Sequence, residues 1–347
     1  MTKPVYIRKF SIYRYEIPLK TEVFIRGVPF SYKQGLVINF EDAEGNKSWG
    51  EISLLPPTEE KINRCIGWIE KNFKYFLGEI DLSFLDKSPE IKFATGSAID
   101  YLNFNTDNLS DISIQVNALL AGKFKSILEE AERKKKQGYS IFKIKLGEHS
   151  LITARDLLTE VRQIIGSEAQ IVLDLNRQWT LNQTLNLIEQ ISDKGILYIE
   201  DPVKTAKELP NYLDLSPIKA GIDEFLEKWN IELEDICKNY LEKIVFVIKP
   251  SILYGKEVWQ KIGEYKSTMK VFTSAWETGI GLRGILNLIF KKRMNIEFVG
   301  LDTYSYFKYD IVEPLLSIPS PKISPHTLKE PFSIIQGALE KIHSREI

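Results

Sequence analysis

The sequence predicts an α/β protein built around an eight-stranded TIM-type barrel, with a smaller α+β domain attached to it. Two observations support this prediction. Residues 112–301 contain eight short apolar runs that alternate with amphipathic segments, which is typical of βα units and a parallel sheet. The residues before about 110 instead have the pattern of strands followed by helices, which is typical of an α+β domain.

The first domain is predicted from two strand patterns and two helix patterns. Val5 to Ile17 and Gly35 to Phe40 are rich in β-branched and aromatic residues and predict antiparallel strands. The polar and aromatic segment Glu22 to Gln34 is too long for a hairpin turn, so it predicts a functional loop between these strands. Thr58 to Phe76 and Pro89 to Leu102 predict helices.

The eight apolar runs of the second domain have the spacing of barrel units. From the second run to the seventh, successive ends lie roughly 25 residues apart, which is what one strand, one helix and two loops occupy. A doubly wound open sheet is the alternative, but no G-x-G-x-x-G follows the first strand and no Walker A motif occurs. The runs are residues 112–119, 140–145, 170–174, 196–200, 218–223, 244–249, 270–274 and 296–301.

The tail after the eighth run breaks this rhythm with prolines at positions 314, 319, 321, 325 and 331. We therefore expect the tail to leave the barrel and pack on the first domain. The predicted division is an α+β domain of residues 1–110 joined by the tail 304–347, and a barrel of residues 111–303.

Composition excludes several classes of function. Lys and Arg total 46 against 47 Asp and Glu, a net charge of −1, so no single-sign field attracts nucleic acid. The sequence contains neither a run of 18 apolar residues nor an apolar block near residue 1, so we expect neither a membrane protein nor a secreted one. Two cysteines fit a cytoplasmic protein. The basic runs at 134–136 and 291–293 predict exposed C-terminal ends of helices.

Charged side chains stand at the carboxyl ends of successive predicted strands, where TIM-type barrels build their sites. Any one of them could be a solvated charge at a strand end. Six in the same phase on consecutive βα units are hard to attribute to chance and indicate a site that binds a small molecule. In chain order they are Lys143, Lys145, Asp174, Glu200, Asp223 and Lys249.

The three carboxylates of this set predict a metal ion. Asp174, Glu200 and Asp223 would repel one another in a low-dielectric site unless a cation lay between them. All-oxygen ligation by only three protein groups suits Mg²⁺, with Mn²⁺ as a substitute. The three histidines are too scattered in the sequence for a zinc site.

The lysines predict proton chemistry. Lys143 and Lys145 are two apart on one strand, so they point to the same face, and each should lower the pKa of the other, which can bring one of them toward neutrality. Lys249 lies four strands further round an eight-stranded ring and should face Lys145 across the mouth. This geometry suits removal of a proton next to a substrate carboxylate, with a metal that stabilises the enediolate.

The chain resembles the enolase superfamily, in the branch of muconate-lactonizing enzymes, dipeptide epimerases and o-succinylbenzoate synthases. The resemblance spans nearly the whole chain and rests on F-K-I-K-L-G, L-D-L-N-R-Q-W, Y-I-E-D-P, G-I-D-E and V-I-K-P-S around the six charged residues. It implies a (β/α)7β modified TIM barrel with an α+β capping domain. It also implies that the three acids bind Mg²⁺ and that Lys145 and Lys249 flank a carboxylate substrate.

The o-succinylbenzoate synthases are the most similar group of this branch. K-P-S-I-L-Y-G from Lys249, T-S-A-W-E-T-G-I-G-L from Thr273, V-N-A-L-L and W-G-E-I-S-L-L-P all resemble their segments. The resemblance implies dehydration of 2-succinyl-6-hydroxy-2,4-cyclohexadiene-1-carboxylate to o-succinylbenzoate in menaquinone synthesis, with Lys145 as base and then acid. Further substrate contacts are expected from Asn176, Ser274, Glu277 and Arg26.

Two other functions remain open at this stage. The same lysines and acids would also serve an N-acylamino acid racemase or a dipeptide epimerase, which move a proton without loss of water. A non-catalytic barrel that acts as a binding module is the more distant alternative. The sequence does not determine the oligomeric state.

Overall fold

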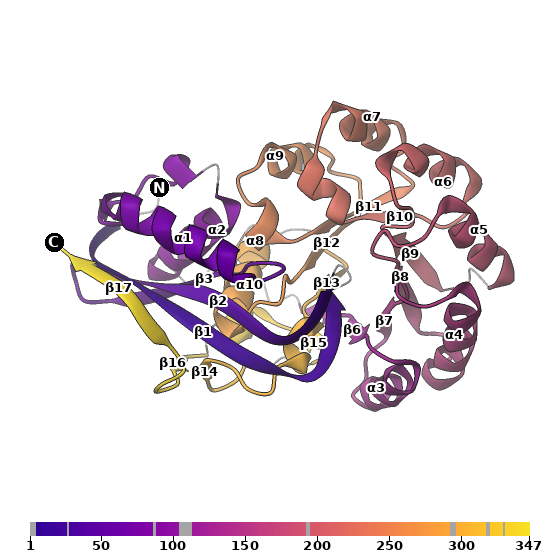
Figure 1. Cartoon of the computed structure of the whole chain (residues 1–347), viewed down its shortest axis with the longest axis horizontal. Coiled ribbons are helices and arrows are strands. Elements are labelled where there is room, and N and C mark those ends of the chain that lie inside the picture. Colours follow the sequence, from indigo (N-terminus) through magenta and orange to yellow (C-terminus); the bar gives the residue numbers. More distant parts are fainter. Residues whose placement is uncertain are drawn as a thin grey trace.

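The computed structural model contains two main sheets, an antiparallel one and a curled one of mostly parallel strands, with helices packed around both (Figure 1). The antiparallel sheet and its helices lie at the end of the molecule where both chain termini are marked, and the parallel sheet lies at the other end. The structure describes residues 5–25, 28–85, 88–103, 113–191, 195–291, 296–316, 320–328 and 330–347.

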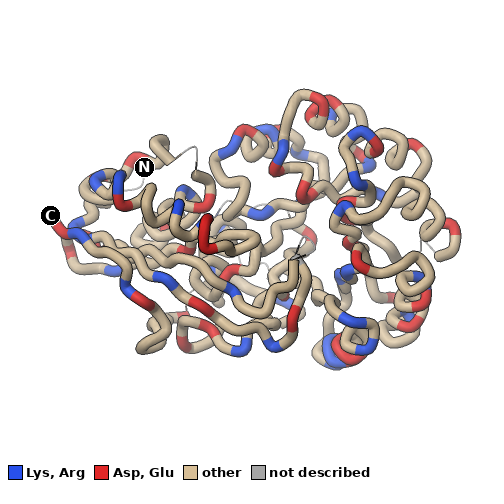
Figure 2. The backbone as a smooth tube through the Cα atoms, in the orientation of Figure 1, with Lys and Arg blue, Asp and Glu red and all other residues tan. Residues whose placement is uncertain are grey.

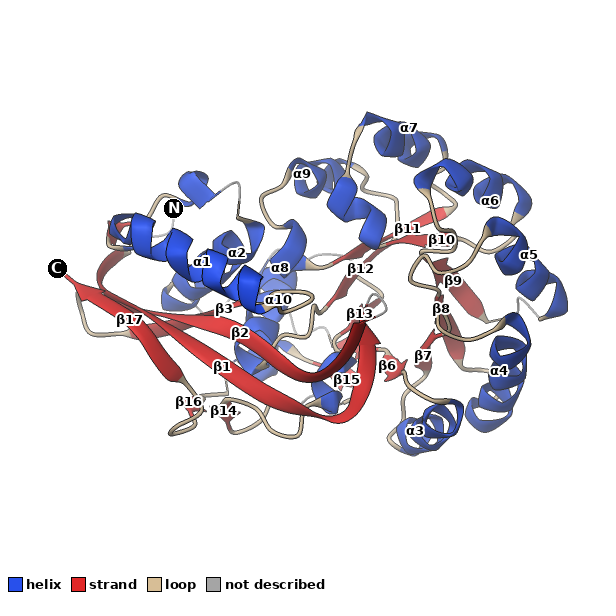
Figure 3. Cartoon of the chain, viewed as in Figure 1, coloured by secondary structure: helices blue, strands red, loops and turns tan. Residues whose placement is uncertain are grey.

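The antiparallel sheet has the strand order β17-β1-β2-β3, with β4 paired to β1. Helices α1 and α2 pack on it (Figure 3). Apolar side chains such as Phe10, Ile38 and Ile69 fill the space between helices and sheet. The bounds are β1 Tyr6–Ile25, β2 Val28–Asp42, β3 Lys47–Ile52, β4 Gly78–Glu79, β17 Glu340–Glu346, α1 Glu59–Asn72 and α2 Pro89–Leu102.

The prediction of a loop at Glu22 to Gln34 is wrong for most of that segment. Strands β1 and β2 continue through it as a paired ribbon, with Val23 opposite Phe30 and Ile25 opposite Val28. A register shift between Pro18 and Val23 marks the irregular part of this pairing. Residues 26 and 27, between the two strands in the sequence, lie outside the described residues, and Arg26 is one of them.

All eight predicted barrel strands are present in the parallel sheet. Its strands follow one another from β6 to β13, and β13 then pairs with β5. Because β5 and β6 are separated only by Asn117, they act as one strand that closes the ring. The strands are β5 Ile114–Val116, β6 Ala118–Leu120, β7 Ile141–Lys145, β8 Gln170–Asp174, β9 Ile196–Glu200, β10 Ala220–Ile222, β11 Ile244–Ile248, β12 Lys270–Thr273 and β13 Phe298–Gly300.

Helical connections between successive strands complete a (β/α)7β modified TIM barrel, as predicted. Each of the first five connections carries one helix, the sixth carries α8 with α9, and the last carries α10. N-cap side chains fix where several of these helices begin. At α4, for example, the Ser150 side chain accepts the backbone N–H of Thr153. The bounds are α3 Phe124–Lys136, α4 Leu151–Ile165, α5 Leu181–Gln190, α6 Leu209–Leu215, α7 Ile231–Asn239, α8 Pro250–Leu253, α9 Glu257–Glu264 and α10 Gly279–Lys291.

The tail after β13 contacts both sheets. Strand β15 (Lys322–Ile323) pairs antiparallel with β5 at the barrel, whereas β17 pairs with β1 in the other sheet. Strands β14 (Val312–Glu313) and β16 (Ser333–Ile334) pair with each other. The predicted boundary at residue 110 lies outside the described residues, so the division into 1–110 and 111–303 stays a proposal.

Charges of both signs are spread along the whole chain (Figure 2). No part of the described backbone carries a long stretch of one sign, in agreement with the balanced composition. Among the described residues, no helix has both the length and the apolar character needed to cross a membrane.

Candidate active site

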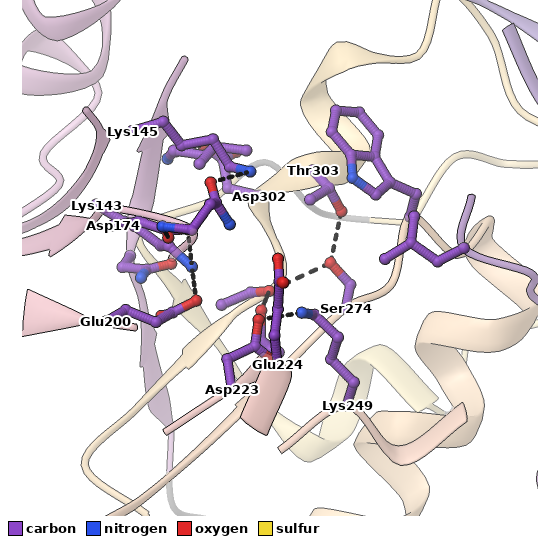
Figure 4. A pocket seen from close by; sticks show the side chains of 17 residues that line it. Lys143, Lys145, Asp174, Glu200, Asp223, Glu224, Lys249, Ser274, Asp302 and Thr303 are labelled. Carbon is purple, nitrogen blue, oxygen red and sulfur yellow. Dashed lines mark hydrogen bonds and ion pairs between the residues drawn. The ribbon is translucent and has the colours of Figure 1, made fainter. Parts of the chain in front are cut away.

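One pocket at the carboxyl ends of the barrel strands is lined by all six charged residues that the sequence singles out. Each is brought there by the strand that it ends or follows, and neighbouring strands are in register, with Lys145 opposite Asp174 and Asp174 opposite Glu200. Figure 4 shows Lys145 and Lys249 on opposite sides of the pocket. The six residues are Lys143, Lys145, Asp174, Glu200, Asp223 and Lys249.

Lysine ammonium groups contact the carboxylates directly. The Nζ of Lys143 donates to Oε1 of Glu200 at 2.6 Å and lies 2.9 Å from Oδ2 of Asp174. Lys249 pairs with Asp223 in the same way. The third lysine, Lys145, instead donates to Oδ1 of Asn176 at 3.3 Å. Lys145 is therefore the lysine of the set that a neutral amide, rather than a carboxylate, holds in place.

These contacts set the protonation of the buried groups. Burial raises the pKa of Glu200 to about 8, and the neighbouring charge of Asp174 adds to the effect. Burial acts in the same direction on Asp174, but the charges of Lys143 and Lys145 outweigh it and hold its pKa below the usual range. Two adjacent carboxyls therefore have opposite shifts, which is typical of functional sites.

The expectation that adjacent lysines have lowered pKa values is wrong for Lys143. Burial does act to lower its pKa, but the facing carboxylates of Asp174 and Glu200 outweigh burial, and the pKa lies well above its ordinary value. The pKa of Lys249 is raised for the same reason, because Asp223 outweighs the effect of burial. The attraction of the carboxylates is therefore stronger than repulsion between the lysines.

The three carboxylates fit a hard cation in their chemistry. In the described part of the chain no three Asp, Glu, His or Cys side chains converge on one point as a ready metal cluster, and Lys143 bridges Asp174 and Glu200. However, Oε2 of Glu200 is buried and accepts no hydrogen bond. A buried carboxylate oxygen without a partner is costly, and a cation would satisfy it.

Left-handed backbone occurs at non-glycine residues in the loops after β8, β9 and β12. Asn176, Arg177, Asp201 and Trp276 have φ values of 45°, 59°, 47° and 63°. Such conformations are costly for side chains larger than glycine and cluster at functional sites. Here they turn the chain sharply at the rim of the pocket.

Asp201 is a residue of the site region that sequence reasoning missed. Its carboxylate is fully buried and accepts the backbone N–H groups of Asp223 at 3.2 Å and Glu224 at 2.9 Å. Burial, with the charge of Asp223, raises its pKa well above the ordinary value. It therefore fixes the loop that carries Asp223. The E-D-P sequence at the end of the predicted strand contains Asp201 and was the signal that could have identified it.

Of the four residues predicted to contact substrate, two line the pocket, one does not, and one lies outside the described residues. Asn176 and Ser274 line the pocket. The hydroxyl of Ser274 bonds to that of Thr303 at 2.5 Å. Glu277 does not line the pocket: the turn at Trp276 directs the Trp276 side chain to the pocket and leaves Glu277 buried beside the antiparallel sheet. Arg26 lies outside the described residues.

The remaining pocket wall includes a buried ion pair that the sequence did not predict. Asp302 lines the pocket, accepts the N–H of Leu119 at 2.8 Å and pairs with Lys134. The prediction that Lys134 is an exposed helix end is therefore wrong, since its side chain is 0% exposed. Lys134 lies on the inward face of α3, so it reaches the barrel instead of solvent. Other wall residues are Leu55, Asn117, Leu119, Glu224, Thr273, Trp276, Gly300 and Thr303.

Comparison with known proteins agrees with this fold. A family model for the enolase C-terminal domain-like fold matches residues 126–223, and a model for the MenC N-terminal domain matches residues 7–98. A dipeptide epimerase from Cytophaga hutchinsonii, solved with Mg and a dipeptide, superposes with a TM-score of 0.77 at 17% identity and covers 97% of this chain and 99% of its own. An N-succinyl Arg/Lys racemase from Bacillus cereus superposes with a TM-score of 0.77 at 18% identity and covers 97% of this chain and 100% of its own.

These matches identify the chain as a member of the enolase superfamily. Within it, the sequence is similar to o-succinylbenzoate synthases over most of its length. The synthase of Pasteurella multocida is 24% identical over 335 residues, which cover 91% of this chain and 95% of that protein.

Proposed function

We propose that this enzyme is a metal-dependent lyase, an o-succinylbenzoate synthase, that dehydrates 2-succinyl-6-hydroxy-2,4-cyclohexadiene-1-carboxylate in menaquinone synthesis. The observation that carries the proposal is the single pocket in which three carboxylates face lysines on two opposite sides. Similarity to o-succinylbenzoate synthases over nearly the full length of both chains supports this choice of reaction.

The charges of the pocket support a carboxylate substrate. Besides Lys143, Lys145 and Lys249, the pocket is lined by Glu224 and Asp302 and by Asp174, Glu200 and Asp223. A divalent cation bound to the last three residues would add positive charge beside the lysines and so attract an anionic substrate. These three residues would hold Mg²⁺, the ion present in related solved structures. When bound, Mg²⁺ would supply the positive charge that stabilises the enediolate of the substrate carboxylate.

The lysines would carry the proton. The amine of Lys145, oriented by Asn176, would take the proton from the carbon next to the ring carboxylate. The resulting ammonium would return that proton to the departing hydroxyl group, so that the C–O bond breaks and water is lost. The ammonium of Lys249, on the opposite side, would stabilise the negative charge that develops on the carboxylate oxygens.

Acidic residues of the pocket wall bear on whether a substrate could carry a free amino group. A dipeptide carries an ammonium group that needs an anionic partner. The two oxygens of Asp302 are already engaged, one by Lys134 and one by the N–H of Leu119. This weighs against an ammonium group at Asp302, whereas Glu224 also lines the pocket and keeps a dipeptide as an alternative substrate.

An N-acylamino acid racemase is the second candidate, because its substrates also lack an ammonium group and a related fold bears that activity. Incubation with the cyclohexadiene substrate and Mg²⁺ should produce the ultraviolet absorbance of the aromatic product, and chelation should abolish it. In deuterated solvent, N-succinylamino acids should then gain no deuterium at the α-carbon. Deuterium gain without any dehydration would overturn the lyase proposal in favour of the racemase.

A further inference from the structure

A second buried group of charges lies where the antiparallel sheet meets the loop after β12. It consists of Lys33 on β2, Glu51 on β3 and Glu277 in the loop, and we call it the interface cluster. The side chains are 0%, 1% and 0% exposed. None of the three lines the active-site pocket.

The lysine of the interface cluster ties the sheet to the loop. Its Nζ donates to Oγ of Ser53 at 2.8 Å and to the carbonyl oxygen of Leu54 at 3.0 Å. The hydroxyl of Ser53 in turn donates to the carbonyl oxygen of Ala275 at 2.8 Å. A continuous chain of hydrogen bonds therefore runs from Lys33 to the loop after β12.

The two carboxylates bind the backbone of the same loop. Glu277 accepts the N–H of Ala275 at 2.5 Å and the hydroxyl of Ser251 at 2.6 Å. Glu51 accepts the N–H groups of Thr278 at 2.8 Å and Gly281 at 3.0 Å. One carboxylate from the loop and one from the sheet thus hold the loop from both sides.

Two pocket residues are attached directly to these bonded positions. Leu55 follows Leu54, and Trp276 lies between Ala275 and Glu277. Both line the pocket. Trp276 has a φ of 63°, a conformation that persists only where the surroundings impose it. The ring of Phe30, from the β1–β2 ribbon, lies 5.9 Å from that of Trp276.

Packing alone does not require charges at this contact. Apolar residues of the same sheet, such as Ile17 and Val37, already join the barrel core. Burial of an ion is costly, and well-packed apolar groups often give equal stability. A fully satisfied polar network does fix one geometry, which apolar contacts do less strictly.

We propose that Glu277 and Lys33 are positioning residues that set Leu55 and Trp276 for substrate recognition, apart from metal binding and proton transfer. This inference rests on the proposed function for its kinetic readout. Loss of either side chain loosens the loop and the neighbouring strand end, and the pocket wall then no longer holds the non-reacting part of the substrate. The effect therefore falls on KM more than on kcat.

The test compares Glu277→Ala, Glu277→Gln and Lys33→Met with the wild-type enzyme. Glutamine can still accept the Ala275 N–H and donate to Ser251, so Glu277→Gln should recover most of what Glu277→Ala loses. We expect KM to rise about 10-fold in Glu277→Ala and Lys33→Met, with kcat within about 3-fold and Mg²⁺ affinity unchanged. Tyr212→Phe is the matched control, because it removes a buried 3.0 Å bond to Ile218, which precedes β10, whereas the pocket lies at the carboxyl ends of the strands.

Hydrogen exchange measured by mass spectrometry provides a readout that needs no substrate. Peptides covering residues 50–56 and 273–281 should exchange faster in Glu277→Ala and Lys33→Met, while peptides of β7 to β9 stay protected as in wild type. A lower thermal midpoint with unchanged KM and unchanged local exchange, as expected for Tyr212→Phe, would overturn the inference. If the wild type does not turn over the proposed substrate, the proposed function fails, and the exchange pattern still decides the positioning role.

Discussion

Two groups of buried charges, the interface cluster and the carboxylates and lysines of the pocket, differ in how completely their polar atoms are satisfied. In the interface cluster, both oxygens of Glu51 and both oxygens of Glu277 accept hydrogen bonds. In the pocket, one oxygen of Glu200 is buried and accepts none. Lys33 is fully buried, whereas the side chains of Lys143 and Lys249 are 13% and 14% exposed.

This difference separates the two tasks that buried charges perform. A network with every atom bonded holds one geometry and has no capacity left for a ligand. A carboxylate with a free buried oxygen, beside cations that solvent can still reach, can exchange its partners when a ligand enters. Changes in the pocket should therefore affect kcat and metal binding, whereas changes in the interface cluster should affect the stability of the fold and KM more than kcat.

The largest effect is expected for Lys145→Ala. Removal of the amine that takes and returns the proton should lower turnover by about 100-fold to 10,000-fold. Mg²⁺ affinity should change little, because Lys145 bonds to Asn176 and contacts no carboxylate directly. The absorbance assay and a calorimetric Mg²⁺ titration measure the two effects. Normal turnover in this variant would show that another group is the base.

A smaller effect on turnover, with a direct effect on metal binding, is expected for Glu200→Gln. Loss of the anionic ligand should weaken Mg²⁺ binding by about 100-fold and lower activity at limiting Mg²⁺, with partial recovery at high concentrations. Glu51→Gln is the matched change in the interface cluster and should leave Mg²⁺ affinity unchanged. Equal loss of Mg²⁺ affinity in both variants would mean that the two groups of charges are not separate.

The pH dependence of stability provides a third comparison through Glu277. Burial, with the charge of Glu51, raises the pKa of Glu277 to about 7. The folded state thus keeps a proton that the unfolded state releases from about pH 4.3 upward, so this group lowers stability as pH rises toward 7. Glu277→Gln removes the effect. Its free energy of unfolding should rise relative to wild type between pH 5 and 7.5, by about 3 kcal/mol at most.

Urea unfolding at these two pH values measures that difference. The Tyr212→Phe variant should show the same pH dependence as wild type, since no carboxyl is changed. A constant offset between Glu277→Gln and wild type at both pH values would contradict the raised pKa.

The fold and the pocket were predictable because their signals are local and repeated. Apolar runs such as 244–248 are buried on both faces, so each is visible as a run of large hydrophobic residues with a charge at its end. Since every such end meets at one mouth, Asp174 and Lys249 could be placed together without knowledge of the loops between them. The helix at Pro89 to Leu102 was predicted with the bounds that the structure shows.

The errors concern contacts made between distant parts of the chain. No local pattern reveals that Lys134 on α3 meets Asp302 at the end of the barrel, since their partnership depends on how the helix packs. Glu277 stands four residues after β12 and was expected in the pocket, but the left-handed turn at Trp276 directs it to the antiparallel sheet. The β1–β2 ribbon was read as a loop because polar residues interrupt its strand pattern.

The smallest effect is expected for Asn176, and two substitutions separate its two roles. The amide oxygen of Asn176 accepts a hydrogen bond from Lys145 at 3.3 Å. The backbone of Asn176 has a φ of 45°, and its N–H donates to Oδ1 of Asp174 at 3.0 Å. Asn176→Gly removes the amide but tolerates this φ, whereas Asn176→Ala removes the amide and adds strain. If orientation of Lys145 is what the residue supplies, both variants should lower kcat by a similar factor of about 10. A loss confined to Asn176→Ala, measured in the absorbance assay, would show instead that the shape of the loop beneath Asp174 is what matters.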